Sequence, residues 1–174
     1  MYLHVIQGIK YILLFAIFSL STAIGMSIAK TYENRVNELK EFKNILNVIK
    51  TKIKFTYEPI PEIFEQISNT INPDIGSIFK IASNNMKFCT AGEAWTKAID
   101  MDILNISLED KTILKDLSKM LGKTDLQGQI SQIEITSSFI DEQIKKAERA
   151  REKNEKMYTK LGVIIGLSIV IVLI

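Results

Sequence analysis

The side chains that could carry out chemistry in this chain are few and scattered. Carboxylate pairs such as Glu109 and Asp110 are of the type used in general acid–base catalysis. Their place at a predicted helix start is explained by the helix dipole instead. His4 is the only histidine and Cys89 the only cysteine, so neither a histidine-based site, an internal disulfide nor a zinc site has enough members. We expect no catalytic or metal site, and a lone thiol fits a reducing compartment.

Nucleotide and nucleic-acid binding are equally unsupported. The eight glycines never form GxGxxG or GxxxxGKS/T, and no nucleophile elbow or HExxH motif is present. Trp95 lies at an apolar helical position, which predicts a core anchor rather than a ligand platform. A formal net charge of +2 is too small to indicate a nucleic-acid surface. We therefore expect no cofactor and no enzymatic activity.

The first apolar segment is long enough to cross a membrane. Residues 11–29 run without a charged side chain between Lys10 and Lys30 and approach the ~20 residues that a membrane-spanning helix needs. A cleavable signal peptide is the alternative, with Ser27-Ile28-Ala29 as a loose cleavage site. Its apolar region is normally ~7 to 15 residues, so an uncleaved anchor fits better. Residues 1–29 are predicted to be an N-terminal segment and transmembrane helix.

A second apolar segment, residues 161–174, is shorter. As a helix its residues rise about 21 Å, less than the ~30 Å hydrocarbon core. Lys160 can extend its side chain to the interface, and local thinning or partner helices can absorb the mismatch. The alternative is a terminal helix in a soluble core, for which the chain is too small. We predict a C-terminal transmembrane helix over 161–174.

Small residues recur at four-residue spacing in both apolar segments. They are Ser21, Gly25 and Ala29 in the first, and Gly162 and Gly166 in the second. This spacing lets helices approach closely in lipid. We expect these faces to pack on each other or on a partner's membrane helices.

Basic residues predict the orientation, because they concentrate between the two segments: Lys30, Arg35, Lys40, Lys145, Lys146, Arg149, Arg151, Lys153, Lys156 and Lys160. The positive-inside rule then places residues 30–160 in the cytoplasm. Residues 141–160 combine these cations with Glu148, Glu152 and Glu155. A solvated helix braced by i,i+4 ion pairs is the favoured interpretation, and contact with anionic lipid headgroups is the alternative.

Residues 30–160 are predicted to form an all-α antiparallel helical bundle, since no period-two strand pattern occurs. One helix continues from the first span until Pro59 and Pro61, and the last runs from a cap at Asp125 into the second span. Gly122 is a predicted left-handed cap. Helix-start signals lie at Pro61, Asn72-Pro73, Thr90 with Glu93, and Ser107 with Asp110. Inward-facing positions are Leu39, Phe42, Leu46, Ile49, Ile53, Ile63, Phe64, Ile67, Ile75, Ile78, Phe79, Ala82, Ala94, Trp95, Ala98, Ile113, Leu114, Leu117, Leu121, Ile130, Ile133, Ile140 and Ile144.

The order of these parts resembles the stage III sporulation protein AB family of endospore-forming bacteria. The residues that carry the likeness are Tyr57-Glu58-Pro59-Ile60-Pro61-Glu62, Ala94-Trp95, Leu121-Gly122, Asp125, Gln129, Glu155-Lys156-Met157-Tyr158 and Leu161-Gly162. Pro59, Pro61, Glu62, Trp95, Gly122, Asp125 and Gln129 are motif positions of unknown role. The likeness covers essentially the whole chain, and its weight lies in the order of the motifs.

The resemblance implies a scaffold in the secretion channel that joins the mother cell to the forespore. Family members look like the cytoplasmic domain of F-type platform proteins of type II secretion and type IV pilus systems, which implies coupling of a cytoplasmic secretion ATPase to other channel subunits. Platform proteins usually carry two such domains and this chain has one, so self-association or other subunits are expected. The implied location is the mother-cell membrane around the forespore. The alternative function is a membrane-tethered adaptor or regulator unrelated to secretion.

Overall fold

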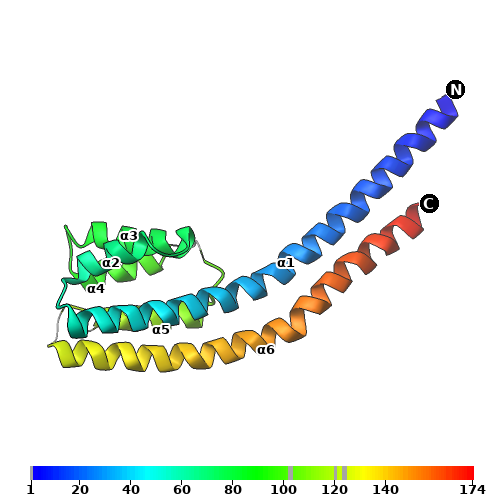
Figure 1. The fold of residues 1–174 in the computed structure, drawn as a ribbon. Coiled ribbons are helices and arrows are strands. Elements are labelled where there is room, and N and C mark those ends of the chain that lie inside the picture. The colour runs from blue at the N-terminus through cyan, green and yellow to red at the C-terminus, as the bar shows by residue number, and fades with distance from the viewer. Residues whose placement is uncertain (1, 102–103, 120, 123–124) are drawn as a thin grey trace. The chain divides into compact units, whose positions relative to one another are not determined.

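The computed structural model describes residues 2–101, 104–119, 121–122 and 125–174, with backbone alone for residues 2–5, so the side chain of His4 lies outside it. The described chain is helical and contains no strand, which confirms the all-α prediction (Figure 1). Its elements are α1 (Tyr2–Phe55), α2 (Ile60–Ser68), α3 (Pro73–Asn85), α4 (Ala91–Ile99), α5 (Leu108–Asp116), the 3-10 turn η1 (Leu117–Lys119) and α6 (Leu126–Leu173).

The chain divides into two compact units. One comprises residues 1–34 and 147–174, and the other residues 35–146. The second unit lies within the predicted domain 30–160, and the helix segments on either side of it group with the apolar spans. Helices α1 and α6 each contribute to both units without a break, as the absence of Gly and Pro between span and domain predicts.

The core of the unit 35–146 is built on an aromatic cluster. Phe64 packs edge-on against Phe79 and Trp95, with ring centroids 5.0 and 5.5 Å apart, and Phe42 of α1 lies 6.3 Å from Phe79. All four side chains are at most 1% exposed. Rings of this size bury more apolar surface than other side chains, and edge-on pairs add about 0.5–1.5 kcal/mol each. These rings therefore link α1, α2, α3 and α4 in one core.

The predicted helix starts are confirmed in detail. The Asn72 side chain accepts a hydrogen bond from the Asp74 N–H at 2.9 Å. Both Thr90 with Glu93 and Ser107 with Asp110 form complete capping boxes. Such caps satisfy N–H groups that have no partner within the helix. The short helices consequently begin where the polar side chains are placed in the sequence.

Two glycines have backbone roles that other residues would fill poorly. Gly122 has φ +69°, the left-handed conformation predicted for it. Gly92, in the first turn of α4, was not singled out from the sequence. A Cβ there would lie 2.4 Å from the Ser118 carbonyl oxygen. The absence of a side chain therefore allows α4 to approach η1 closely.

The unit 1–34 with 147–174 contains two helical segments long and apolar enough to cross a membrane. Its outward side chains are large and apolar: Phe15 is 72% exposed and Val172 is 82% exposed. In water this exposure would be unfavourable by about 25 cal/mol per Å² of apolar surface.

Candidate functional site

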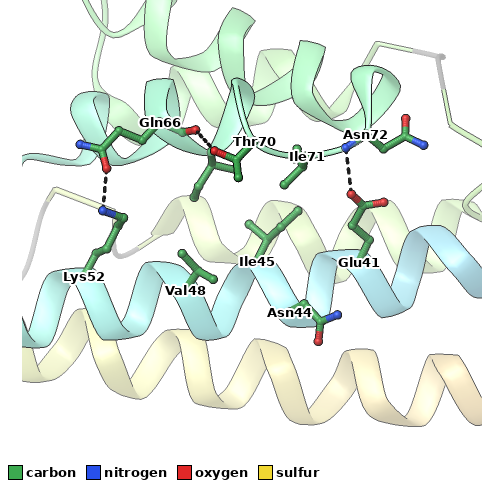
Figure 2. Close-up of a pocket in the computed structure, with 10 residues that line it drawn as sticks. Glu41, Asn44, Ile45, Val48, Lys52, Gln66, Thr70, Ile71 and Asn72 are labelled. Atoms are coloured by element: carbon green, nitrogen blue, oxygen red, sulfur yellow. Dashed lines mark hydrogen bonds between the residues drawn. The ribbon is translucent and has the colours of Figure 1, made fainter.

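A groove of about 620 Å³ lies between α1 and the α2–α3 segment of the unit 35–146. Ile45 and Val48 of α1 face Ile67 and Ile71 across it, as Figure 2 shows for three of these residues. Val48 is 45% exposed, whereas Ile45 and Ile67 are nearly buried. The middle of the groove is therefore an apolar surface open to solvent on one side.

Polar contacts close both ends of this groove. At one end the Lys52 ammonium donates to Gln66 Oε1 at 2.5 Å and contacts Glu58 Oε2 at 3.3 Å. At the other, Glu41 Oε1 accepts the Asn72 N–H at 3.1 Å (Figure 2). Neither end contains a nucleophile with an adjacent base. The arrangement offers hydrophobic contact in the middle and hydrogen bonding at both ends.

A smaller cavity of about 230 Å³ brings together residues of two motifs. Tyr57, Glu58 and Pro59 line it from the α1–α2 connection, and Gln129 lines it from α6. Tyr57 has φ 54° and is 76% exposed. This conformation is uncommon and strained for a bulky residue. The motif positions Pro59 and Gln129, far apart in sequence, thus share one surface.

Glu58 lines the smaller cavity, and its carboxylate also contacts Lys52 and Gln66 at the end of the groove. Its partial removal from water raises the pKa of the carboxyl, but hydrogen bonds from Lys52, Thr56 and Gln66 outweigh that effect. The net result holds the pKa of Glu58 below its ordinary value. The carboxylate consequently stays ionised at neutral pH and positions Lys52 and Gln66 at the end of the groove.

The other motif positions support the backbone. Pro59 precedes α2 in an extended conformation, and Pro61 and the exposed Glu62 lie in its first turn. The Trp95 side chain donates from Nε1 to the Leu114 carbonyl at 2.6 Å. Asp125 Oδ1 accepts the Gly128 N–H at 3.0 Å and so caps α6, as the sequence predicts. Trp95 and Asp125 thus make contacts that position helices.

An ion pair in the core of the unit 35–146 was not foreseen from the sequence. Arg35 Nε lies 2.8 Å from Asp110 Oδ2, and Arg35 Nη2 lies 3.1 Å from Asp110 Oδ1. Asp110 Oδ2 also accepts the Ser107 N–H at 2.8 Å. The sequence predicts that Asp110 acts at a helix start, through the helix dipole and with Ser107, and that Arg35 contributes to membrane orientation. The one sequence signal for this pairing is the position of Arg35, a basic residue on the inward face of the first helix.

The five small residues of the apolar segments lie where α1 and α6 meet. Ser21 Oγ donates to the Gly162 carbonyl at 2.8 Å. A Cβ on Gly25 would lie 2.8 Å from Gly162 Cα, and one on Gly166 would lie 3.0 Å from the Phe18 ring. Ala29 is 5% exposed. The two backbones thus approach so closely that larger residues at Gly25 or Gly162 would separate them.

The described residues contain no group of three or more metal-ligating side chains. Cys89 is half-buried, with its Sγ 3.3 Å from the Asn85 carbonyl oxygen. Glu109, the exposed neighbour of Asp110, accepts a hydrogen bond from Lys146 at 2.8 Å. That bond, with one from Gln143, lowers the pKa of Glu109. A carboxylate with a lowered pKa is a poor proton donor at neutral pH.

Comparisons with known proteins agree with one another. Residues 10–174 match the family model described as stage III sporulation protein AB. Stage III sporulation protein AB of Bacillus subtilis (strain 168) is 25% identical over 157 residues, which are 88% of this chain and 92% of that protein. A solved structure of a stage III sporulation protein AB has 18% identity and a TM-score of 0.65, and the match covers 69% of this chain and 98% of that structure's chain.

Proposed function

Because the chain belongs to the stage III sporulation protein AB family, we propose that it is a non-enzymatic membrane scaffold of the sporulation channel. In this role the unit 35–146 lies in the cytoplasm and couples a secretion-type ATPase to membrane components. The two apolar segments anchor it in the mother-cell membrane around the forespore. The proposal combines family membership with the physical character of the two units.

The observation that carries the proposal is the exposure of large apolar side chains on the unit 1–34 with 147–174. Ile12 is 70% exposed and Ile171 is 73% exposed, in addition to Phe15 and Val172. A lipid environment removes the cost of exposing them, whereas water does not. Small residues that pair α1 with α6 leave the large ones facing outward. This distribution supports a two-helix anchor.

The proposed orientation can be tested with single cysteines. Phe88, which is 90% exposed, is changed to Cys in a Cys89→Ser background, and Gly8→Cys serves as the matched control on the other side. When the chain is produced in the plasma membrane of vegetative cells, we expect a membrane-impermeant maleimide to label position 8 in intact spheroplasts and position 88 only after permeabilisation. Labelling of position 88 in intact spheroplasts would contradict a cytoplasmic domain.

The scaffold role predicts a physical partner rather than a turnover reaction. Affinity purification of the full-length chain from sporulating cells, after crosslinking and detergent extraction, is expected to recover a secretion-type ATPase. Crosslinks identified by mass spectrometry should fall on residues 35–146. Recovery of channel subunits with no ATPase would refute the coupling role, and recovery of only non-secretion partners would favour a tethered adaptor.

A further inference from the structure

Four basic residues of α6 lie on one narrow face just before the second apolar segment. They are Arg149, Lys153, Lys156 and Lys160, at spacings of four, three and four. At about 100° per residue, this spacing places them within an arc of about 60°. All four are exposed. Lys160 directly precedes Leu161, so this basic face ends at the predicted membrane surface.

Acidic residues of the same segment lie on a different face. Glu148, Glu152 and Glu155 fall about 60–120° to one side of Arg149 around the helix. Glu155 pairs with Arg151 at 3.4 Å. Arg151 lies on the same face as these carboxylates, away from the basic face. Within the part of the chain that the structure describes, none of the four residues of the basic face forms an ion pair. The carboxylates therefore do not pair with the basic face, although Arg151 and Glu155 form an i,i+4 ion pair of the kind expected for residues 141–160.

On α1, the basic residue directly after the first apolar segment is Lys30, and it is paired with a carboxylate. Lys30 pairs with Glu33 at 2.7 Å, and this contact, with a smaller contribution from Arg151 of α6, lowers the pKa of Glu33. Nearby, the rings of Tyr32 and Tyr158 are stacked with centroids 5.8 Å apart. Tyrosines are enriched at membrane interfaces. The four exposed basic residues of α6 thus border a tyrosine pair of the type found at membrane interfaces.

We propose that the basic face formed by Arg149, Lys153, Lys156 and Lys160 binds the phosphate groups of anionic phospholipids in the membrane that anchors the chain. Along the helix axis, Lys156, Lys153 and Arg149 lie about 6, 10 and 16 Å from Lys160. Attraction to an anionic membrane falls off within a Debye length, about 8 Å at physiological salt. Lys160, Lys156 and Lys153 therefore contribute most. The inference rests on membrane insertion and is independent of the coupling to an ATPase.

The test uses the purified full-length chain, reconstituted in vesicles of phosphatidylcholine with one third phosphatidylglycerol. Flotation first establishes insertion. Native mass spectrometry from mixed micelles then gives the ratio of phosphatidylglycerol-bound to phosphatidylcholine-bound protein. Substitution of Lys153, Lys156 and Lys160 by Gln should lower that ratio by about tenfold or more, since each basic residue near the surface contributes substantially to anionic lipid binding. Substitution of the same three lysines by Arg should preserve it.

The matched control replaces three exposed lysines of the other unit, Lys54, Lys87 and Lys97, by Gln. It changes the net charge equally and should leave the lipid ratio unchanged. An equal loss in both triple variants, or a wild-type chain that floats but shows no preference for phosphatidylglycerol, would overturn the lipid site. A wild-type chain that fails to float would instead refute the membrane anchor on which it rests.

Discussion

Arg35 of α1 and Asp110 of α5 form a two-pronged ion pair in which the carboxylate is completely buried while the guanidinium remains one-fifth exposed. Asp110 also completes the capping box of α5 through the Ser107 N–H. One carboxylate therefore both starts a helix and holds it against α1. A charge in this position is stabilising only while its partners remain, because an unpaired buried charge is costly.

Asp110→Ala is expected to lower the free energy of unfolding by about 3 kcal/mol, because it leaves Arg35 without its partner and removes half of a helix cap. Thermal unfolding of the full-length chain in detergent, followed by Trp95 fluorescence, measures the effect. Glu142→Ala is the control, since Glu142 is an exposed carboxylate of the same unit. If Asp110→Ala unfolded at the same temperature as the control, the ion pair would have no role in stability.

Gly25→Leu is expected to separate the two apolar segments, because a Cβ there would lie 2.7 Å from the Tyr158 carbonyl oxygen. A short bifunctional thiol crosslinker between Tyr32→Cys and Tyr158→Cys, in a Cys89→Ser background, reports their proximity. Crosslinking should be efficient with Gly25 and nearly lost with Leu. Gly8→Leu is the matched control, since a Cβ at Gly8 meets nothing within 4 Å. Equal crosslinking in both Leu variants would show that close backbone approach is not required.

Thr136→Val is expected to stabilise the unit 35–146 by about 1 kcal/mol. The Thr136 hydroxyl is buried and has no hydrogen-bond partner among the described residues, and valine keeps its shape without the unsatisfied polar group. Thr112→Val serves as the comparison, because the exposed Thr112 hydroxyl donates to the Leu108 carbonyl. A lower unfolding temperature for Thr136→Val would show that the hydroxyl is satisfied in solution.

We expect the contribution of Glu109 to the stability of the folded chain to be lost in acid. Hydrogen bonds from Lys146 and Gln143 lower its folded pKa below the unfolded value. Its contribution is therefore present above the unfolded pKa, about 4.3, and lost as pH falls through the folded pKa. Glu109→Gln should destabilise the chain at pH 7, and the difference from wild type should shrink towards pH 3. A difference that stayed constant with pH, measured by thermal unfolding, would contradict this linkage.

For Glu38 we expect the opposite dependence of stability on pH. Burial raises its folded pKa, although hydrogen bonds from Asn105 partly oppose the shift. A raised pKa contributes stability that is fully present below the unfolded pKa and is lost as pH rises through the folded pKa. Glu38→Gln does not titrate, so its unfolding temperature relative to wild type should be higher at pH 7 than at pH 4. The reverse order would show that the hydrogen bonds outweigh the burial.

Most of the helical architecture was predictable because its signals are local. The spacing of Leu39, Phe42 and Ile49 predicts one buried face within α1, and capping residues such as Thr90 and Asp125 predict helix starts to within a residue. Helix periodicity and end-capping depend on residues three or four positions apart. Ile113 is the exception among the inward positions, since it is only half-buried.

Contacts between distant residues emerged only from the folded chain. The pairing of Arg35 with Asp110, the approach of Gly92 to Ser118 and the groove between α1 and α2 each join segments separated by many residues. No local pattern encodes them, because they depend on the direction and register in which helices pack. The periodicity that predicts which face of a helix is buried leaves open which other helix covers it, and packing in three dimensions decides that.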